Sequence, residues 1–256
     1  MPTTQLSTVA DLVITMPAAV NVLERLGIDF CCHGQQSVEQ ACTGRGITVD
    51  ALLGLIESEP KPAGERPWSN APMTDIIRFI VDSHHRYTRE AIAFLPPVAR
   101  KVREVHGERH PELVEVEELT RTIAAELLPH MLKEEQILFP FIIALEGAMS
   151  AGTTPPMPFF GTVKNPVRMM MLEHETVGEK LAEIRVLTSG YELPEGACNS
   201  YRILFEKLQE LEGDLHRHIH LENNILFLKA IEAEEKAAVP TFEMAEGETC
   251  GGGCSH

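Results

Sequence analysis

The chain has 256 residues, 44% of them hydrophobic, which is enough to bury a sizeable core in one large domain or in a large and a small one. Its formal charge of −16 disfavours nucleic acid or an anionic membrane as a partner, because both would repel an acidic surface. The N-terminus lacks the basic and apolar regions of a signal peptide and no apolar run is long enough to span a bilayer, so a cytoplasmic location is expected.

The N-terminal part predicts a small helical domain. Apolar residues at helical spacing predict a first helix that ends at Gly27. Ser37 is placed to cap a second short helix, and another helix is expected to begin near Thr48. The adjacent Cys31 and Cys32, in the stretch DFCCHGQQ, fall in the loop after the first helix. Cysteines in a reducing compartment are more often free, catalytic or metal-binding than paired in disulfides, so this loop is a candidate functional segment.

A proline-rich segment and four long helices follow. The segment EPKPAGERPWSNAP contains four prolines and predicts a linker. After it the spacing of apolar residues is helical throughout, which predicts an all-α protein with a four-helix bundle. Pro96 and Pro97 are expected to kink or interrupt the first of these helices. The expected parts are a small helical domain at 1–58, the linker at 59–72, the bundle at 73–235 and a flexible Gly/Cys tail at 236–256.

An internal repeat is the most informative feature of the sequence. HMLKEEQILF, which begins at His130, and HIHLENNILF, which begins at His218, share the pattern H-x-x-x-E-x-x-I-L-F. Each half also has an earlier histidine: His85 lies 45 positions before His130, and His174 lies 44 positions before His218. This matching predicts a duplicated helical hairpin.

The spacing places one histidine and one glutamate of each repeat on the same helix face. Residues i and i+4 are neighbours on an α-helix, so His130 lies beside Glu134 and His218 beside Glu222. Apolar residues continue the same stripe, which indicates that these side chains point into the bundle. Burying an unpaired carboxylate costs roughly several kcal/mol, so a cation, and hence a metal centre, is expected here.

Together with His85 and His174, the repeats supply four imidazoles and two carboxylates from four helices. This set is too large for a structural zinc site, which has four ligands and often includes thiolates. It suits two iron or manganese ions with bridging carboxylates and open positions for a small ligand, and the donor types leave the choice of metal open. His84 is the alternative to His85, although spacing to Val81 and Ile77 favours His85. The remaining helical histidines are expected at the surface: His106, His110, His216 and His220.

The two H-x-x-x-E repeats behind DFCCHG resemble the hemerythrin-like domain and the cysteine-bearing domain fused to it in di-iron proteins that repair iron-sulfur centres. The similarity extends from about residue 6 to 230 and includes WSNAP, KEEQILFP and LENN. The resemblance implies a four-helix hemerythrin-like bundle that holds two non-haem iron ions with oxo and carboxylate bridges. The implied iron ligands are His85, His130, Glu134, His174, His218 and Glu222, with the two glutamates bridging the ions.

Cys31 and Cys32 are expected to form a functional thiol pair. They lie a few residues before the Ser37 cap and next to His33, and a helix N-terminus or a positive charge favours the reactive thiolate. Adjacent cysteines form only a strained, easily reduced disulfide, so a structural bridge is not expected. The pair is expected to act as a reductant or as a transient acceptor of iron or NO, with partner binding or an incidental loop as alternatives. His33 either tunes the thiols or fills a turn.

By resemblance, the expected function is the repair of iron-sulfur clusters damaged by nitrosative or oxidative stress. Damaged iron-sulfur proteins are then the partners, and NO or O2 the small ligands. A di-iron NO reductase and a reversible O2- or NO-binding sensor are the alternatives, so enzyme status, donation of iron and a possible homodimer stay open. Cys250 and Cys254 are expected in a flexible end, with metal binding as the weaker alternative.

Overall fold

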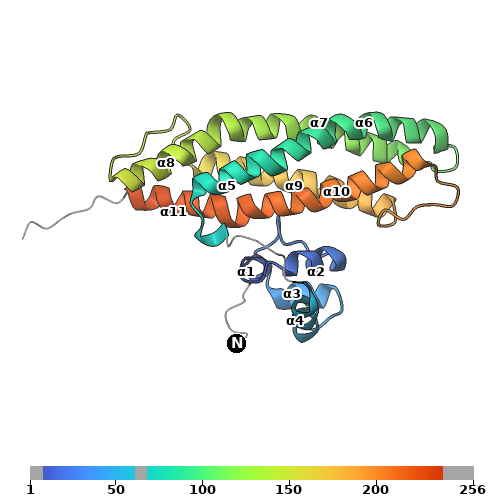
Figure 1. Cartoon of the computed structure of the whole chain (residues 1–256), viewed down its shortest axis with the longest axis horizontal. Helices are drawn as coiled ribbons and strands as arrows, with labels where there is room; N and C mark the ends of the chain where they lie inside the picture. The colour runs from blue at the N-terminus through green and yellow to red at the C-terminus, as the bar shows by residue number, and fades with distance from the viewer. Residues whose placement is uncertain (1–7, 61–67, 239–256) are drawn as a thin grey trace, which may run out of the picture.

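The computed structural model describes residues 8–60 and 68–238, which form helices connected by loops (Figure 1). Within these ranges no strand is present, so the predicted all-α fold is confirmed. A group of short helices near the N-terminus lies against a bundle of four long rods. Part of the predicted linker, 61–67, and the predicted tail from residue 239 onward, with Cys250 and Cys254, lie outside the described residues.

Four short helices make up the N-terminal domain. They are α1 (Val9–Thr15), α2 (Ala19–Leu26), α3 (Val38–Gly44) and α4 (Val49–Ser58). The side-chain oxygens of Thr8, Ser37 and Thr48 accept backbone hydrogen bonds at the starts of α1, α3 and α4. Gly27 ends α2 with a φ of 64°, a left-handed conformation that glycine adopts without strain. Helix α1 was not predicted from the sequence.

The bundle consists of four antiparallel rods that follow the 3₁₀ turn η2 (Trp68–Asn70). The rods are α5 (Met73–Phe79), η3 (Ile80–His85) and α6 (Arg86–His106); α7 (Leu113–Lys133), η4 (Glu134–Leu138) and α8 (Phe139–Ala151); α9 (Lys164–Leu187); and α10 (Asn199–Leu221), η5 (Glu222–Leu226) and α11 (Phe227–Ala238). The interruption predicted at Pro96 and Pro97 does not occur, because α6 continues through both. Pro97 is exposed, where water can reach backbone carbonyls that lose their helical partner.

Three of the rods change from α to π geometry for about one turn near their middle. The π turn η3 ends at His85, η4 begins at Glu134 and η5 begins at Glu222. A π turn inserts an additional residue into the helix and occurs frequently at functional sites. The sequence did not predict these turns, although they coincide with predicted ligand residues.

Two apolar clusters fill the bundle, and the second includes Ile80, Leu138 and Leu226 of the π turns. One contains Leu127 and Leu215 and continues into the N-terminal domain through Phe30. The other contains Phe139 and Phe227. The N-terminal domain therefore shares a core with one end of the bundle, and the buried histidines and glutamates lie between the two clusters.

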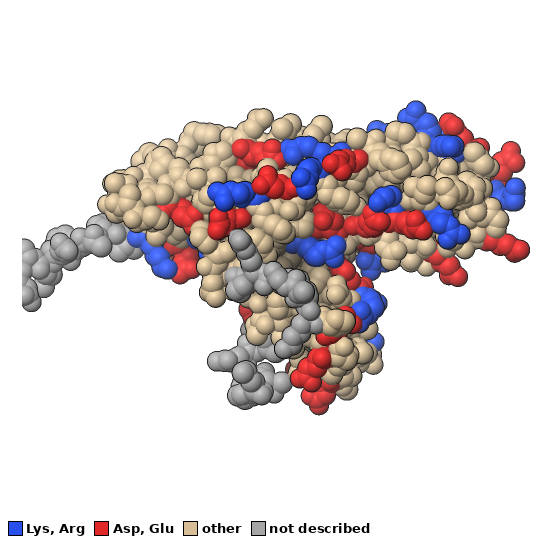
Figure 2. All heavy atoms as spheres, viewed as in Figure 1, with Lys and Arg blue, Asp and Glu red and all other residues tan. Residues whose placement is uncertain are grey.

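The surface of the bundle is charged with both signs. On the face shown in Figure 2, Lys and Arg side chains alternate with Asp and Glu along the rods. Among the described residues, no helix combines the length and hydropathy needed to cross a membrane.

Candidate metal centre

The structure brings the six predicted ligand residues together at the middle of the bundle. All six are buried, and they come from all four rods: His85 from η3, His130 from α7, Glu134 from η4, His174 from α9, His218 from α10 and Glu222 from η5. The i, i+4 spacing of each repeat sets its histidine and glutamate on one face, and packing turns that face inward.

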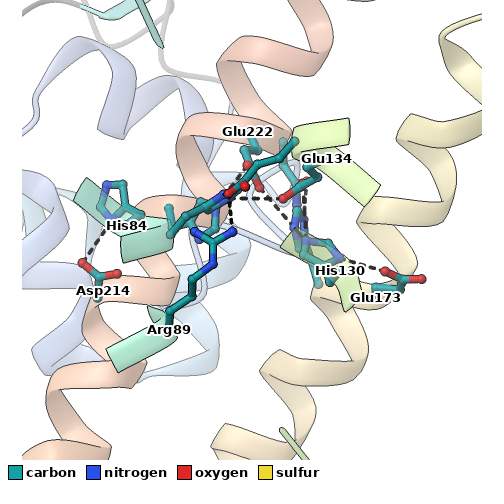
Figure 3. Close-up of polar contacts among 12 residues, drawn as sticks. His84, Arg89, His130, Glu134, Glu173, Asp214 and Glu222 are labelled. Atoms are coloured by element: carbon teal, nitrogen blue, oxygen red, sulfur yellow. Dashed lines mark hydrogen bonds and ion pairs between the residues drawn. The ribbon is translucent and has the colours of Figure 1, made fainter. Parts of the chain in front are cut away.

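Glu134 faces a different histidine with each carboxylate oxygen. Its Oε2 lies 3.3 Å from Nε2 of His85, and its Oε1 lies 3.3 Å from Nε2 of His130. Figure 3 shows Glu134 and Glu222 projecting into the same space from two different rods. A carboxylate in this position can bind one cation through each oxygen.

Glu222 repeats the arrangement in the second half of the bundle. Its Oε1 lies 3.0 Å from Nε2 of His218, and its Oε2 lies 3.2 Å from Nε2 of His174. The donors therefore form two groups that share both carboxylates, one with His85 and His218 and the other with His130 and His174. Within each group the ligating atoms lie within 4.8 Å of one another.

Three of the four histidines direct their second ring nitrogen at a neighbouring polar side chain. The pairs are His85 Nδ1 with Glu135 Oε1 at 2.6 Å, His130 Nδ1 with Glu173 Oε2 at 2.8 Å, and His174 Nδ1 with Asn223 Oδ1 at 2.9 Å. Such bonds keep the proton on Nδ1 and leave the Nε2 lone pair for a metal. Sequence reasoning missed all three partners, although each is next to a predicted ligand in the chain. Nδ1 of His218 has no hydrogen-bond partner among the described residues.

The donor set fits a metal cation. Within the described part of the chain, both oxygens of Glu134, Oε2 of Glu222 and Nε2 of His85 are buried without a hydrogen-bond partner. Burial raises the pKa of both glutamates, but the surrounding imidazoles lower it more, so both are carboxylates. Burial lowers the pKa of His130, and the two carboxylates raise it more, to about 9. The pKa of His85 is raised as well, so without a metal the protons on His85 and His130 supply positive charge, and a bound metal would displace them.

His84 lies outside the two groups of donors. Its Nδ1 lies 3.0 Å from Oδ1 of Asp214, and Figure 3 shows it turned away from the two glutamates. Its ring stacks on that of His218 with 5.4 Å between the centroids. The structure therefore places His85, rather than His84, among the clustered donors.

Of the four histidines expected at the surface, the expectation is wrong for His220, and His216 is only partly exposed. The ring of His220 is buried, and it packs edge-on against Phe30 together with the ring of His216. Both lie where the N-terminal domain covers α10, a contact that helical periodicity does not reveal. His106 and His110 are half-buried at the far end of the bundle.

Cys31 and Cys32 lie in the loop between α2 and α3, beside the bundle. Their sulfur atoms are 3.7 Å apart, and Oδ1 of Asp29 accepts the backbone N–H of both residues. Cys31 is buried and Cys32 is partly exposed. The loop therefore presents one accessible sulfur and one covered sulfur.

The thiolate character expected for this pair is wrong for Cys31. The hydrogen bond to Cys32, burial and the Asp29 carboxylate all raise the pKa of Cys31 well above its ordinary value. His33 does not offset this effect, because its Nδ1 pairs with Oδ2 of Asp29 at 2.7 Å. Cys31 is therefore a protonated thiol at neutral pH.

Two cavities reach these groups. One, of about 340 Å³, is lined by His130 and His174 of the donor set. Another, of about 380 Å³, lies between the N-terminal domain and α9 and is lined by Cys31, Cys32 and Gly178. Small molecules therefore have space beside both the clustered donors and the thiols.

Comparisons with known proteins agree with this two-part organisation. The hemerythrin HHE cation binding domain family matches residues 77–230, and a domain of unknown function, DUF542, matches residues 5–59. The iron-sulfur cluster repair protein YtfE of Yersinia pseudotuberculosis serotype IB (strain PB1/+) is 36% identical over 228 residues, which is 87% of this chain and 96% of the relative. The protein of the same name from Yersinia pestis (strain Pestoides F) has the same identity and coverage.

Proposed function

The chain belongs to the family of iron-sulfur cluster repair proteins in which a DUF542 domain precedes a hemerythrin domain, and from this membership we propose that it repairs damaged clusters with two non-haem iron ions. The observation that supports two ions is the pair of donor groups that share Glu134 and Glu222. Each ion would have two imidazoles and one oxygen from each glutamate. Four protein donors leave positions free on an ion that prefers six ligands.

The residues of the chain would hold and protect such a centre. Iron at these positions would supply a reversible change of oxidation state and sites for NO or O2. Glu134 and Glu222 would bridge, and the bonds at Nδ1 of His85, His130 and His174 would keep each Nε2 lone pair directed at an ion. The apolar clusters on both sides limit the access of water.

The thiol pair would supply electrons to the repair. When two thiols form one disulfide, they release two electrons and two protons. The two electrons would reduce two ferric ions of a damaged cluster to the ferrous state, and the protons would pass to the solvent. The 3.7 Å between the sulfur atoms of Cys31 and Cys32 means that a small movement closes the bond. A disulfide between adjacent cysteines is strained and is readily reduced by cellular thiols, which would return the pair to its starting state.

The partners in this proposal are damaged iron-sulfur proteins, with NO or O2 as small ligands. The relatives named as iron-sulfur cluster repair proteins support the first. Free cysteines at the loop support a reducing compartment such as the cytoplasm. A homodimer formed through the N-terminal domain stays a prediction, which a measurement of the mass in solution would test.

The test is the recovery of a [4Fe-4S] enzyme after damage by NO. Iron-loaded wild type is compared with Cys31→Ala/Cys32→Ala, and Cys198→Ala serves as the control because it removes an exposed cysteine far from the loop. Each variant is first shown to retain its iron. Wild type and the control are expected to restore activity, and the double variant is not.

Two other outcomes would change the proposed function or the proposed role of the thiols. If iron-loaded wild type restores no activity, the repair function is wrong; consumption of NO with turnover would then indicate a reductase, and a reversible spectral change without product would indicate a sensor. If the double variant repairs as well as wild type, the metal centre carries the function and the proposed role of the thiols is wrong.

A further inference from the structure

Asn223 contacts both domains of the protein. Its Oδ1 accepts a hydrogen bond from Nδ1 of His174 at 2.9 Å, and its Nδ2 donates to the backbone carbonyl of Cys31 at 3.2 Å. The side chain is buried, with 4% of its surface exposed. One amide group therefore connects a residue of the metal centre to the thiol loop.

The internal repeat shows what this amide adds. In the first half, the residue after the bridging glutamate is Glu135, which accepts from Nδ1 of His85. In the second half, the residue at the same position is Asn223, which accepts from Nδ1 of His174. A carboxylate only accepts hydrogen bonds, whereas an amide also donates. The amide keeps the bond to its histidine and has a donor left for the N-terminal domain.

The loop that carries Cys31 and Cys32 packs closely against this part of η5. Asn224 donates from Nδ2 to the carbonyl of Phe30 at 3.1 Å. At Gly34 a Cβ atom would lie 2.6 Å from the same carbonyl oxygen, 3.0 Å from Cβ of Ala10 and 3.3 Å from Nδ2 of Asn224, so no side chain fits there without a shift of the loop. Both asparagines of η5 therefore hold the loop through its backbone carbonyls, Asn223 at Cys31 and Asn224 at Phe30.

We infer that Asn223 is a positioning residue that couples docking of the Cys31 loop to the metal position formed with His130 and His174. The docked loop fixes the amide, the amide fixes the His174 ring with its proton on Nδ1, and Nε2 then faces the metal position. Release of the loop frees the ring and uncovers Cys31 at the same time. Iron and thiol thus become available to a damaged cluster in one movement. The inference rests on the metal positions proposed above and is independent of repair activity.

Coupling acts equally in both directions, because an interaction free energy between two sites is reciprocal. Filling the metal position must therefore favour the docked loop by the same factor by which docking favours the metal. Loss of a hydrogen-bond partner of a metal-bound histidine typically weakens metal binding by about 10- to 100-fold. An effect of about tenfold is expected in each direction.

The first experiment measures alkylation of Cys31 by N-ethylmaleimide in the full chain, with and without iron, by peptide mass spectrometry. Cys31 is buried, so its alkylation reports opening of the loop. Iron is expected to slow the reaction about tenfold. Asn223→Asp can still accept from His174 but cannot donate to Cys31, so it is expected to retain iron and lose the protection.

Asn224→Ala is the matched control. It removes a docking bond of the same type, to Phe30, without touching His174. It is expected to speed alkylation in both states and leave their ratio near tenfold, because a purely structural contact shifts both rates alike. If the ratio in Asn223→Asp equals that of wild type, the coupling does not pass through Asn223 and the inference is wrong. That outcome would also follow if iron protected Cys31 by binding its sulfur directly.

The second experiment approaches the coupling from the loop. Gly34→Ala leaves Asn223 and all six donors unaltered, but its Cβ would crowd the Phe30 carbonyl that Asn224 binds, so the loop is expected to dock less well on η5. The rate at which a chelator removes iron is measured together with the circular dichroism of the helices. One of two ions is expected to leave about tenfold faster, with the helical signal unchanged. Faster alkylation of Cys31 with both ions leaving at the wild-type rate would overturn the inference. Neither experiment uses a damaged cluster, so a failed repair assay does not affect it.

Discussion

The two halves of the bundle place the same donor pattern on different supports. In the first half, Glu135 holds His85 and is itself paired with Arg89 at 2.6 Å. In the second half, Asn223 holds His174 and is bonded to the Cys31 carbonyl. The first support is an ion pair within the bundle, and the second is a neutral link to another domain.

The two halves therefore differ in what supports their histidines, although the donor pattern is the same. The metal-binding pattern requires one histidine and one glutamate at fixed spacing in each half, and both halves keep it. The next residue in the chain is not a ligand, so it is free to differ. The first half is expected to provide a rigid support, and the second half a support that responds to the N-terminal domain.

The largest effect is expected where the halves are equivalent. Glu134→Ala and Glu222→Ala each remove a carboxylate that is shared by both donor groups, so iron at both positions should be lost. The weakening should exceed the roughly 10- to 100-fold loss typical of outer partners. Iron per chain is measured by elemental analysis, with Glu118→Ala, at an exposed position, as the control. Retention of one ion by either variant would show that its carboxylate does not bridge.

A second test uses pH on the iron-free protein. Burial lowers the pKa of His130, and the nearby carboxylates raise it more, to about 9, whereas burial lowers the pKa of His218 in the other half. The raised pKa of His130 stabilises the folded protein at pH values below about 6.5. This contribution to the free energy of unfolding is lost as the pH rises from about 6.5 toward 9, at up to roughly 1.4 kcal/mol per pH unit. The free energy of unfolding in urea should therefore fall across this window.

The iron-loaded protein is the control for that measurement, because bound imidazoles no longer gain or lose a proton there. The lowered pKa of His218 acts in a different window, since its contribution is lost only as the pH falls below 6.5. An iron-free protein whose stability rose between pH 6.5 and 9 would contradict the assignment of raised values to the first half.

A third test removes the carboxylate of Glu135, which supports His85 in the first half of the bundle. Glu135→Ala leaves Nδ1 of His85 without its carboxylate, so iron affinity should fall about 10- to 100-fold at the position formed with His218. Competition with a coloured chelator measures the change. Unlike the Asn223 variants, it should not alter the alkylation of Cys31, and an altered alkylation rate would remove the distinction between the halves.

The smallest effect is expected at Arg89. Arg89→Met removes a partly exposed ion pair with Glu135 but keeps the hydrogen bond from His85 to the same carboxylate. Pairs of this kind contribute about 0–1 kcal/mol, so iron affinity should change by at most severalfold. The same chelator competition applies. A loss as large as that of Glu135→Ala would show that the guanidinium, rather than the carboxylate, positions His85.

The sequence predicted the all-α bundle and the residues that meet at its centre, because both depend on helical spacing. The i, i+4 pattern places His130 beside Glu134 on any helix, and the repeat places the second pair in the same way. Neither statement requires knowledge of how the rods pack.

Features that depend on packing between distant segments were missed. The expectation that His220 lies at the surface failed because the N-terminal domain covers it. The expectation of a thiolate at Cys31 failed because the hydrogen bond to Cys32, burial and Asp29 all raise the pKa of the Cys31 thiol. The bond between Asn223 and Cys31 joins residues 192 positions apart, and no local pattern indicates it.

The π turns make the bundle tolerant of a change in chain length at particular points. Deleting one residue from a regular α-helix turns everything after it by about 100°, which would carry the downstream apolar stripe out of the core. A π turn already contains a surplus residue, so removal of the exposed Ile137 from η4 would restore a regular helix and leave α8 in phase. Such a deletion should give a folded bundle in which the change is confined to η4, where it alters the positions of Glu134 and Glu135.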